Sequence, residues 1–289
     1  MSGRALVAGP RPSQRVRLSD LRIRHVWPLW LALAALMYTG LDVYARRGVF
    51  GIDAHAYWLT GHHVHLYGAT ATTRDAYLYS PAFAQAIRPL TWLPWPAFYG
   101  LWVVLEAAAF AWLLKPLGWA WGVPALLLCG FEIYQGNVVA LLAVALVVGL
   151  GRGPRAWAFP ALTKVTVALG PLWFVVRGEW RALRTVAVTV AVVLAISVAL
   201  DPSAWASWLH LLVRHPGLDP TLPYRLATAV AVTVYAARAD RTWLLAPAMI
   251  LASPVTHGLG QYLTLLAAIP RLRRPHTVHA RRDPATAVR

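Results

Sequence analysis

The polar stretch from Phe50 to Pro81 separates two strongly apolar segments and carries the residues best suited to chemistry. It begins with a carboxylate, and the spacing Asp53-x-x-x-Tyr57 places this carboxylate and a phenol on one face of a short helix. Near its end, Pro81 biases Ser80 away from helical dihedrals, so the segment Tyr77-x-Tyr79-Ser80-Pro81 is expected in an extended or turn conformation. Because a carboxylate among neutral polar groups is suited to act as a general base, we interpret this stretch as an active-site loop.

Composition indicates that this loop belongs to a membrane protein. Of the 289 residues, 58% are hydrophobic and only 13% are charged, with a mean hydropathy of +0.53. Soluble domains carry about 25% charged residues. The formal net charge of +16 does not indicate nucleic-acid binding, because the basic residues lie in two tails and in short loops between apolar runs. That distribution is typical of a multi-span protein that obeys the positive-inside rule.

The apolar runs predict an all-α, polytopic transmembrane helical bundle of the plasma membrane. Basic tails at residues 1–24 and 271–289 are expected in the cytoplasm, and residues 25–270 form the membrane domain. Outer loops are expected at about 46–96, 134–137 and 201–223. Short amphipathic helices are expected at 54–65 and 81–91 in the first of these loops, and spans are expected at 26–44, 97–114, 119–134, 137–150, 183–200 and 224–237.

Two apolar segments are expected to break. A single span over 156–176 would place the arginines that follow it outside, so this segment is predicted to be a hairpin of two short helices with Lys164 near its apex. Residues 243–269 are too long for one span and are predicted to break at Ser253-Pro254, with His257 just after the break. In this topology the predicted site residues meet at the outer leaflet, where polar groups in an apolar bundle indicate a site; they are Asp53, Tyr57, Tyr79, Gln135, Asn137, Lys164, Arg225 and His257.

A metal or disulfide framework is not predicted. Cys129 is the single cysteine and lies in an apolar run. Four histidines follow Asp53 at near-helical spacings, but no acidic pair joins them and Asp75 is distant in sequence; they are His55, His62, His63 and His65. We interpret them as surface histidines of an amphipathic helix and predict neither a metal nor a cofactor.

The order of these motifs resembles the family 87 membrane mannosyltransferases. The resemblance runs from about Trp27 to Ile269 and rests on these motifs in order: Asp53-x-x-x-Tyr57-Trp58, Gly68, Tyr79-Ser80-Pro81, Gln135-Gly136-Asn137, Lys164 and Ser253-Pro254-x-x-His257. Ser80 stands where the family commonly has a second proline, and Val165 follows the lysine where proline is common.

This resemblance implies a GT-C fold and an inverting, metal-independent glycosyltransferase. The implied donor is a polyprenyl-phosphate sugar, with mannose as the sugar. The implied acceptor is a cell-envelope glycolipid or lipid-linked glycan on the outer face of the membrane. Asp53 would be the catalytic base, with His257 as a second catalytic residue. Substrate-binding roles fall to Tyr57, Tyr79, Gln135, Asn137, Lys164 and Arg225, with the two cations suited to a phosphate.

Each residue also has a structural interpretation that the sequence leaves open. Asp53 favours a helix N-terminus whether or not it is a base. Lys164 fits a snorkelling lysine or a structural ion-pair partner, and His257 fits a side chain that satisfies a loosened backbone. Two other classes of function stay open as well, a transporter without catalysis and a non-catalytic scaffold for an envelope-assembly enzyme. Discontinuous helices around a midplane site would favour the transporter.

Overall fold

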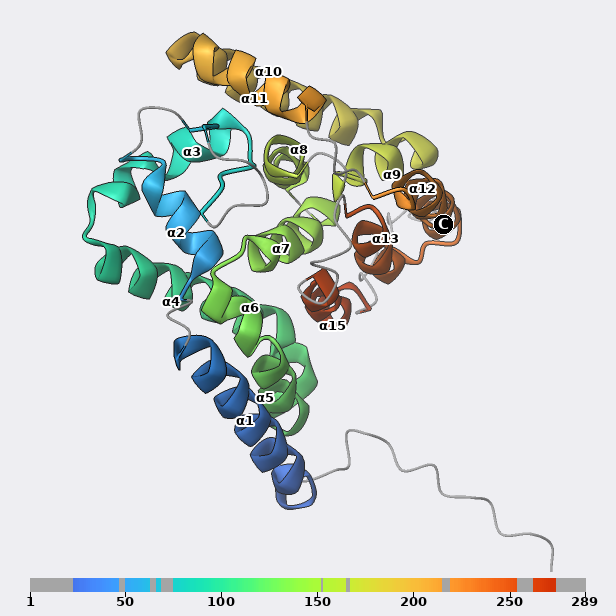
Figure 1. Ribbon diagram of the computed structural model, residues 1–289. Helices are drawn as coiled ribbons and strands as arrows, with labels where there is room; N and C mark the ends of the chain where they lie inside the picture. The colour runs from blue at the N-terminus through green and yellow to red at the C-terminus, as the bar shows by residue number, and fades with distance from the viewer. Residues whose placement is uncertain are drawn as a thin grey trace, which may run out of the picture.

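The computed structural model describes residues 23–46, 50–62, 66–68, 75–151, 153–164, 167–214, 219–253 and 262–273. Within these ranges the chain is helical, with no strand (Figure 1). The first half contains α1 (Ile23–Arg46), α2 (Ile52–Leu59), α3 (Pro81–Ile87), η2 (Arg88–Trp92), α4 (Trp95–Leu114), η3 (Lys115–Leu117), α5 (Gly118–Leu128), α6 (Gly130–Gln135) and α7 (Val139–Leu150). The second half contains η4 (Pro154–Trp157), α8 (Ala158–Thr163), α9 (Gly170–Arg177), α10 (Trp180–Leu200), α11 (Pro202–Arg214), α12 (Leu222–Arg238), η6 (Thr242–Leu244), α13 (Leu245–Leu251), η7 (Leu263–Ala268) and α15 (Ile269–Leu272).

Helix α7 forms the centre of the bundle. Its residues are almost all apolar, and side chains from opposite faces, such as Ala140 and Leu142, are fully buried. A helix that is apolar all round is stable only where other helices surround it. Accordingly α7 packs against α4, η4 and η7, and lies between the two halves of the molecule in Figure 1.

Other helices expose their apolar side chains instead. Along α10 the valines, leucines and isoleucine are mostly exposed, including Ile196 and Leu200. In the described part of the chain, two segments are long and apolar enough to cross a membrane, Trp95–Leu128 and Trp180–Leu200, and shorter apolar helices lie between them and around them. Exposed apolar surface of this extent is costly in water, so the helices indicate a membrane protein.

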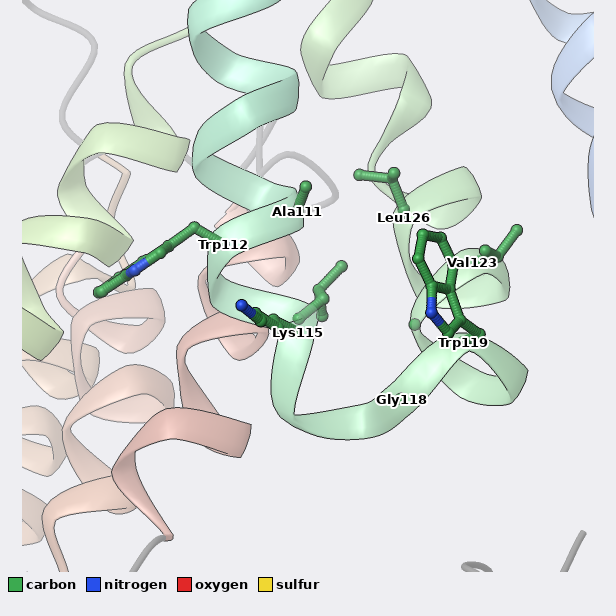
Figure 2. Close-up of a pocket in the computed structure, with 9 residues that line it drawn as sticks. Ala111, Trp112, Lys115, Gly118, Trp119, Val123 and Leu126 are labelled. Carbon is green, nitrogen blue, oxygen red and sulfur yellow. The ribbon is translucent and has the colours of Figure 1, made fainter.

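The longer of these two segments is folded back on itself. The 3-10 turn η3 ends α4, and Gly118 follows with a φ of 70°, a left-handed dihedral that glycine adopts without strain. In Figure 2, α4 runs down to this turn and α5 runs back up from it. The segment therefore supplies two antiparallel helices, as the predicted spans at 97–114 and 119–134 require.

The predicted break near Lys164 is present in the structure. Helix α8 ends at Thr163, and α9 begins at Gly170, so the lysine lies between two short helices. The predicted amphipathic helix at 54–65 is wrong in its length, because α2 ends at Leu59 and a turn follows. Gly61 in that turn packs directly on the Thr91 side chain, a contact that leaves no room for a Cβ.

Hydrogen bonds join one end of several helices into a common region. The Tyr99 hydroxyl near the start of α4 donates to the Tyr134 carbonyl oxygen near the end of α6, at 2.9 Å. Gln85 of α3 donates to the carbonyl oxygen of Ser197, near the end of α10, at 3.1 Å. The loop helices α2 and α3 are therefore fixed at the same end of the bundle as the ends of α6 and α10.

Candidate active site

Asp53 lies in the first turn of α2, where a carboxylate interacts favourably with the helix dipole. The residue before the helix, Gly51, has a φ of 51°, and a Cβ on it would lie 2.6 Å from the Tyr99 ring. Glycine therefore lets the chain enter α2 close against α4. This entry directs the half-buried Asp53 carboxylate towards the turn between α6 and α7.

Asn137 connects this carboxylate to a cation. Its amide nitrogen donates to Asp53 Oδ2 at 3.0 Å, and its amide oxygen accepts a hydrogen bond from Lys164 Nζ at 3.1 Å. The three residues come from α2, from the α6–α7 turn and from the break between α8 and α9. The buried Asn137 amide therefore lies between the Asp53 carboxylate and the Lys164 ammonium and is hydrogen-bonded to both.

The turn that carries Asn137 depends on the glycine before it. Gly136 has a φ of 72°, and a Cβ there would lie 2.5 Å from the Ala54 Cβ and 3.2 Å from the Trp102 ring. The Trp102 indole nitrogen also donates to the Gly136 carbonyl oxygen at 2.9 Å. The close approach of α2 and α4 to this turn therefore fixes where the Asn137 amide points.

Two tyrosines close the cluster on one side. The Tyr57 hydroxyl donates to the Tyr79 hydroxyl at 3.0 Å, and the Tyr79 hydroxyl lies 3.5 Å from Asn137 Oδ1. Lys164 Nζ lies over the Tyr79 ring, 5.2 Å from its centroid, and over the Tyr262 ring, 4.7 Å away. Aromatic faces stabilise an ammonium group, so these rings help to keep the lysine charged.

The segment before α3 is held by its own tyrosines and by α8. The Tyr77 hydroxyl donates to the carbonyl oxygen of Ser80 at 2.9 Å, and the Tyr67 hydroxyl donates to that of Tyr79 at 2.8 Å. The Ser80 hydroxyl donates to the Leu162 carbonyl oxygen in α8. With a ψ of 157°, Ser80 is extended, as expected for the residue before Pro81.

Burial and charge act in opposite directions on Asp53. Burial raises the pKa of the Asp53 carboxyl above its usual value, whereas the Lys164 charge and the Asn137 hydrogen bond lower it. Burial also raises the pKa of Tyr57 and of Tyr79, so both phenols are neutral hydrogen-bonding groups at physiological pH. Asp53 is thus the group of the cluster that is suited to gain and lose a proton.

Two further carboxylates lie behind the cluster. Glu106 is fully buried, and its Oε1 accepts a hydrogen bond from the Trp102 indole at 2.9 Å. Glu132 in α6 is 1% exposed, and neither acid is part of the hydrogen bonds that join Asp53, Asn137 and Lys164. The structure places both acids near Lys164 and Asp53 in the protein interior.

Three predicted site residues stand apart from the cluster. Gln135 is buried in α6, and no hydrogen bond of the Asp53 network includes it. Arg225 pairs with Asp219 at 3.0 Å and donates to the carbonyl oxygens of Leu251 and Ser253, where the chain leaves α13. His257 lies outside the described residues, between Ser253 and Tyr262.

Tyr262 was not predicted. It follows the segment that contains His257, and its ring lies against Lys164 as described above. The signal in the sequence was an aromatic residue at the far end of a broken apolar stretch. Many tryptophans and tyrosines of this chain occupy such positions, so that signal was not specific.

One of the histidines after Asp53 has a partner that is distant in the sequence. His55 Nδ1 and Asp75 Oδ1 lie 2.8 Å apart, although 20 residues separate them. His55 therefore has one acidic neighbour, whereas the absence of an acidic pair among these histidines stays a prediction. In the described part of the chain, no group of three or more histidine, cysteine, aspartate or glutamate side chains is arranged to hold a metal ion.

Three hollows differ in their relation to the cluster. One of them, about 500 Å³, is an apolar groove between α4 and α5 beside Lys115 and Trp119. It lies at the C-terminal end of α4, next to the turn to α5 (Figure 2), and no residue of the cluster lines it. A second apolar groove of about 370 Å³ runs past Phe83 and Leu162 and is also lined by Thr163, the residue before Lys164 in the chain. A polar cavity of about 440 Å³ lies where α2, α3 and α10 end.

Comparison with known families gives one match. Residues 77–288 match the family described as Glycosyltransferase family 87. The matched range includes Tyr79, Asn137, Lys164 and Arg225, whereas Asp53 precedes it and joins the matched residues only through the contacts above. No curated protein matches the chain, and no solved structure matches it.

Proposed function

The chain belongs to glycosyltransferase family 87, and on that premise we propose that it transfers mannose from a polyprenyl-phosphate donor to an envelope glycolipid or lipid-linked glycan. The reaction takes place at the outer face of the plasma membrane, and both termini are cytoplasmic. A single contact set supports this proposal most strongly. Asn137 holds the Asp53 carboxylate at 3.0 Å through one end of its amide and the Lys164 ammonium at 3.1 Å through the other.

In the proposed reaction Asp53 is the general base. It accepts the proton of the acceptor hydroxyl while that oxygen bonds to the anomeric carbon of the sugar. The bond between that carbon and the phosphate oxygen breaks, and its electron pair leaves on the phosphate. A single displacement with one carboxylate base inverts the anomeric configuration, as in inverting glycosidases.

Lys164 supports the leaving group. The phosphate gains negative charge as the sugar departs, and a preorganised ammonium lowers the energy of that charge more than water would. We place the phosphate where Lys164 can exchange its bond to Asn137 for one to a phosphate oxygen. His257 is proposed as a second phosphate contact, and Arg225 as the side chain that anchors the chain leading to it through Ser253.

The polyprenyl chain is proposed to occupy the apolar groove beside Lys164. This groove lies between α3, α4, α7, α8 and α10, and its walls are apolar except for Thr163, next to the lysine. A lipid chain held there would bring its phosphate to the Lys164 ammonium. Tyr57, Tyr79, Gln135 and Asn137 are proposed to contact the sugars.

The direct test is transfer from radiolabelled polyprenyl-phosphate-mannose to extracted envelope lipids, with products identified by mass spectrometry. Replacing the general base, as in Asp53→Asn, is expected to lower the rate by about a hundredfold or more at unchanged expression. Asp42→Asn is the matched control, because Asp42 pairs with exposed Arg46 on α1, at 2.7 Å, and takes no part in the Asp53–Asn137–Lys164 contacts. Full activity in Asp53→Asn would overturn the mechanism.

A further inference from the structure

The polar cavity at the ends of α2, α3 and α10 has no role in the reaction proposed above. It has a volume of about 440 Å³, within the range of small-molecule sites. Its lining brings together uncharged polar groups and two opposite charges, from Thr60, Gln85, Arg88 and Asp201. Cavities lined this way bind ligands with many hydrogen-bonding groups more readily than lipids.

The charges in this cavity favour a neutral ligand. Arg88 is exposed and lies near enough to Asp201 to help lower the pKa of that carboxyl, after the hydrogen bonds from Ala204 and Ser203. An anion such as phosphate would gain from the guanidinium and lose to the carboxylate. Vicinal hydroxyls gain from both, because each hydroxyl both donates and accepts a hydrogen bond.

The polar side chains are also held in place before any ligand binds. Asp201 Oδ1 accepts hydrogen bonds from the Ser203 hydroxyl at 2.7 Å and the Ala204 amide at 2.9 Å, so Oδ2 is not needed to cap α11. The Gln85 side chain uses one N–H for the Ser197 carbonyl oxygen and retains another N–H and its own carbonyl oxygen. Preorganised groups of this kind lose little entropy on binding.

The cavity and the candidate base share helix α2. Asp53 lies in its first turn, and Thr60 and Gly61, which line the cavity, follow its last residue. Seven residues at about 1.5 Å per residue separate Asp53 from Thr60 by about 10 Å along the helix. Across this distance, a single sugar ring is too short to occupy the cavity and place its hydroxyl at Asp53 at the same time.

We propose that this cavity is a remote subsite for the acceptor glycan, which binds sugars beyond the one that receives the transferred residue. The assignment rests on the proposed glycosyltransferase function and deepens it, because it makes the acceptor an oligosaccharide rather than a single sugar. Arg88 and Asp201 contact the hydroxyls of the distal sugars, and Gln85 supplies a further amide contact. The subsite sets acceptor length and leaves donor binding unaffected.

Acceptor chain length provides the test. The purified full chain in detergent is assayed with radiolabelled polyprenyl-phosphate-mannose and octyl mannosides of increasing length as acceptors. The wild-type kcat/KM is expected to rise with length. In Arg88→Gln/Asp201→Asn the value for the longest acceptor should fall about fivefold, since each lost hydrogen bond weakens binding by a few-fold. The kcat/KM for the shortest acceptor and the KM for the donor should each change by less than about twofold, which is less than the loss of one hydrogen bond would cause.

A matched control and a binding measurement distinguish the possible failures. Arg184→Gln removes an exposed arginine from the opposite end of α10 and should behave as wild type. Equal losses for short and long acceptors, or no length dependence in the wild type, would overturn the subsite. If no acceptor is mannosylated at all, the proposed function fails. Saturation-transfer NMR with the free mannose oligosaccharide then decides the subsite, which is supported if the double variant loses the signal and refuted if it does not.

Discussion

The amide nitrogen of Asn137 lies 3.0 Å from Oδ2 of Asp53, although 84 residues separate them in the chain. This contact joins the first loop helix to the α6–α7 turn, and the same amide accepts a hydrogen bond from Lys164. An amide can meet both demands at once because it donates through nitrogen and accepts through oxygen. A carboxylate at position 137 would repel Asp53, and an alkyl group would serve neither neighbour.

Asn137 and Lys164 should act as one unit. Asn137→Ala and Lys164→Met are each expected to lower kcat/KM, and the double variant should lose less than the product of the two losses, with a coupling of about 0.5–3 kcal/mol. Initial rates of mannose transfer in the wild type, the two single variants and the double variant measure this coupling. Lys115→Met, at the turn between α4 and α5, should combine with Asn137→Ala independently. Strict multiplicativity for the Lys164 pair would contradict the shared network.

The pH dependence of activity should report Asp53. Its ionised form is the active base, so activity is lost as pH falls through its pKa, which burial holds above the ordinary value. Lys164 lowers that pKa, so Lys164→Met should raise it and move the acidic limb of log kcat/KM to higher pH. The measurement is a pH profile of the residual activity, with Lys115→Met as the control. An unmoved limb would show that the limb belongs to another group.

Two glycines offer a matched test of crowding near the site. Gly136 and Gly178 have φ values of 72° and 68° with ψ values of 37° and 22°, so alanine at either position costs about 1–2 kcal/mol in dihedral strain. Only Gly136→Ala adds a clash, with the Ala54 Cβ at 2.5 Å, whereas the nearest atom to a Cβ on Gly178 is the Trp180 indole nitrogen at 3.9 Å. The added cost is about 1–3 kcal/mol.

Thermal unfolding in detergent measures the difference between these glycine variants. Gly136→Ala should unfold at the lower temperature and should also lose transfer activity, because the clash displaces the Asn137 amide. Gly178→Ala should keep its activity. Equal melting temperatures for the two variants would mean that α2 and the turn are packed less closely than the structure shows.

Blocking the apolar groove should affect long donors selectively. Ala86 lines this groove, and Ala86→Trp fills part of it. The KM for a long-chain polyprenyl donor should rise about tenfold, which corresponds to about 1.4 kcal/mol, or about two methylene groups left unburied. A short-chain donor should be little affected, and Val188→Trp on the exposed face of α10 is the control. An equal effect on both donors would place the lipid chain elsewhere.

The sequence predicted the membership of this cluster better than its detailed contacts. Asp53, Tyr57, Tyr79, Asn137 and Lys164 were selected because polar groups are costly in an apolar bundle and must find one another. The structure brings all five together. Their catalytic and binding roles remain predictions.

The sequence pattern did not predict which residues distant in the chain are in contact. Nothing in the sequence showed that His55 meets Asp75 or that the Tyr262 ring lies against Lys164, because both contacts depend on how loops fold back. Arg225 was selected for its charge, yet it pairs with Asp219 and binds backbone carbonyls. In the sequence, a buried cation that stabilises the fold looks the same as one that binds substrate. Only its neighbours in the structure distinguish the two roles.

The wide separation of the three central residues has a consequence for biogenesis. A ribosome delivers Asp53 to the membrane long before Asn137, and Asn137 comes 27 residues before Lys164. Until the lysine has been inserted, the nascent chain carries Asp53 without the cation that shares the Asn137 amide with it in the folded protein. Chains that stop short of Lys164 should therefore be substrates for quality-control proteolysis rather than partly active enzymes.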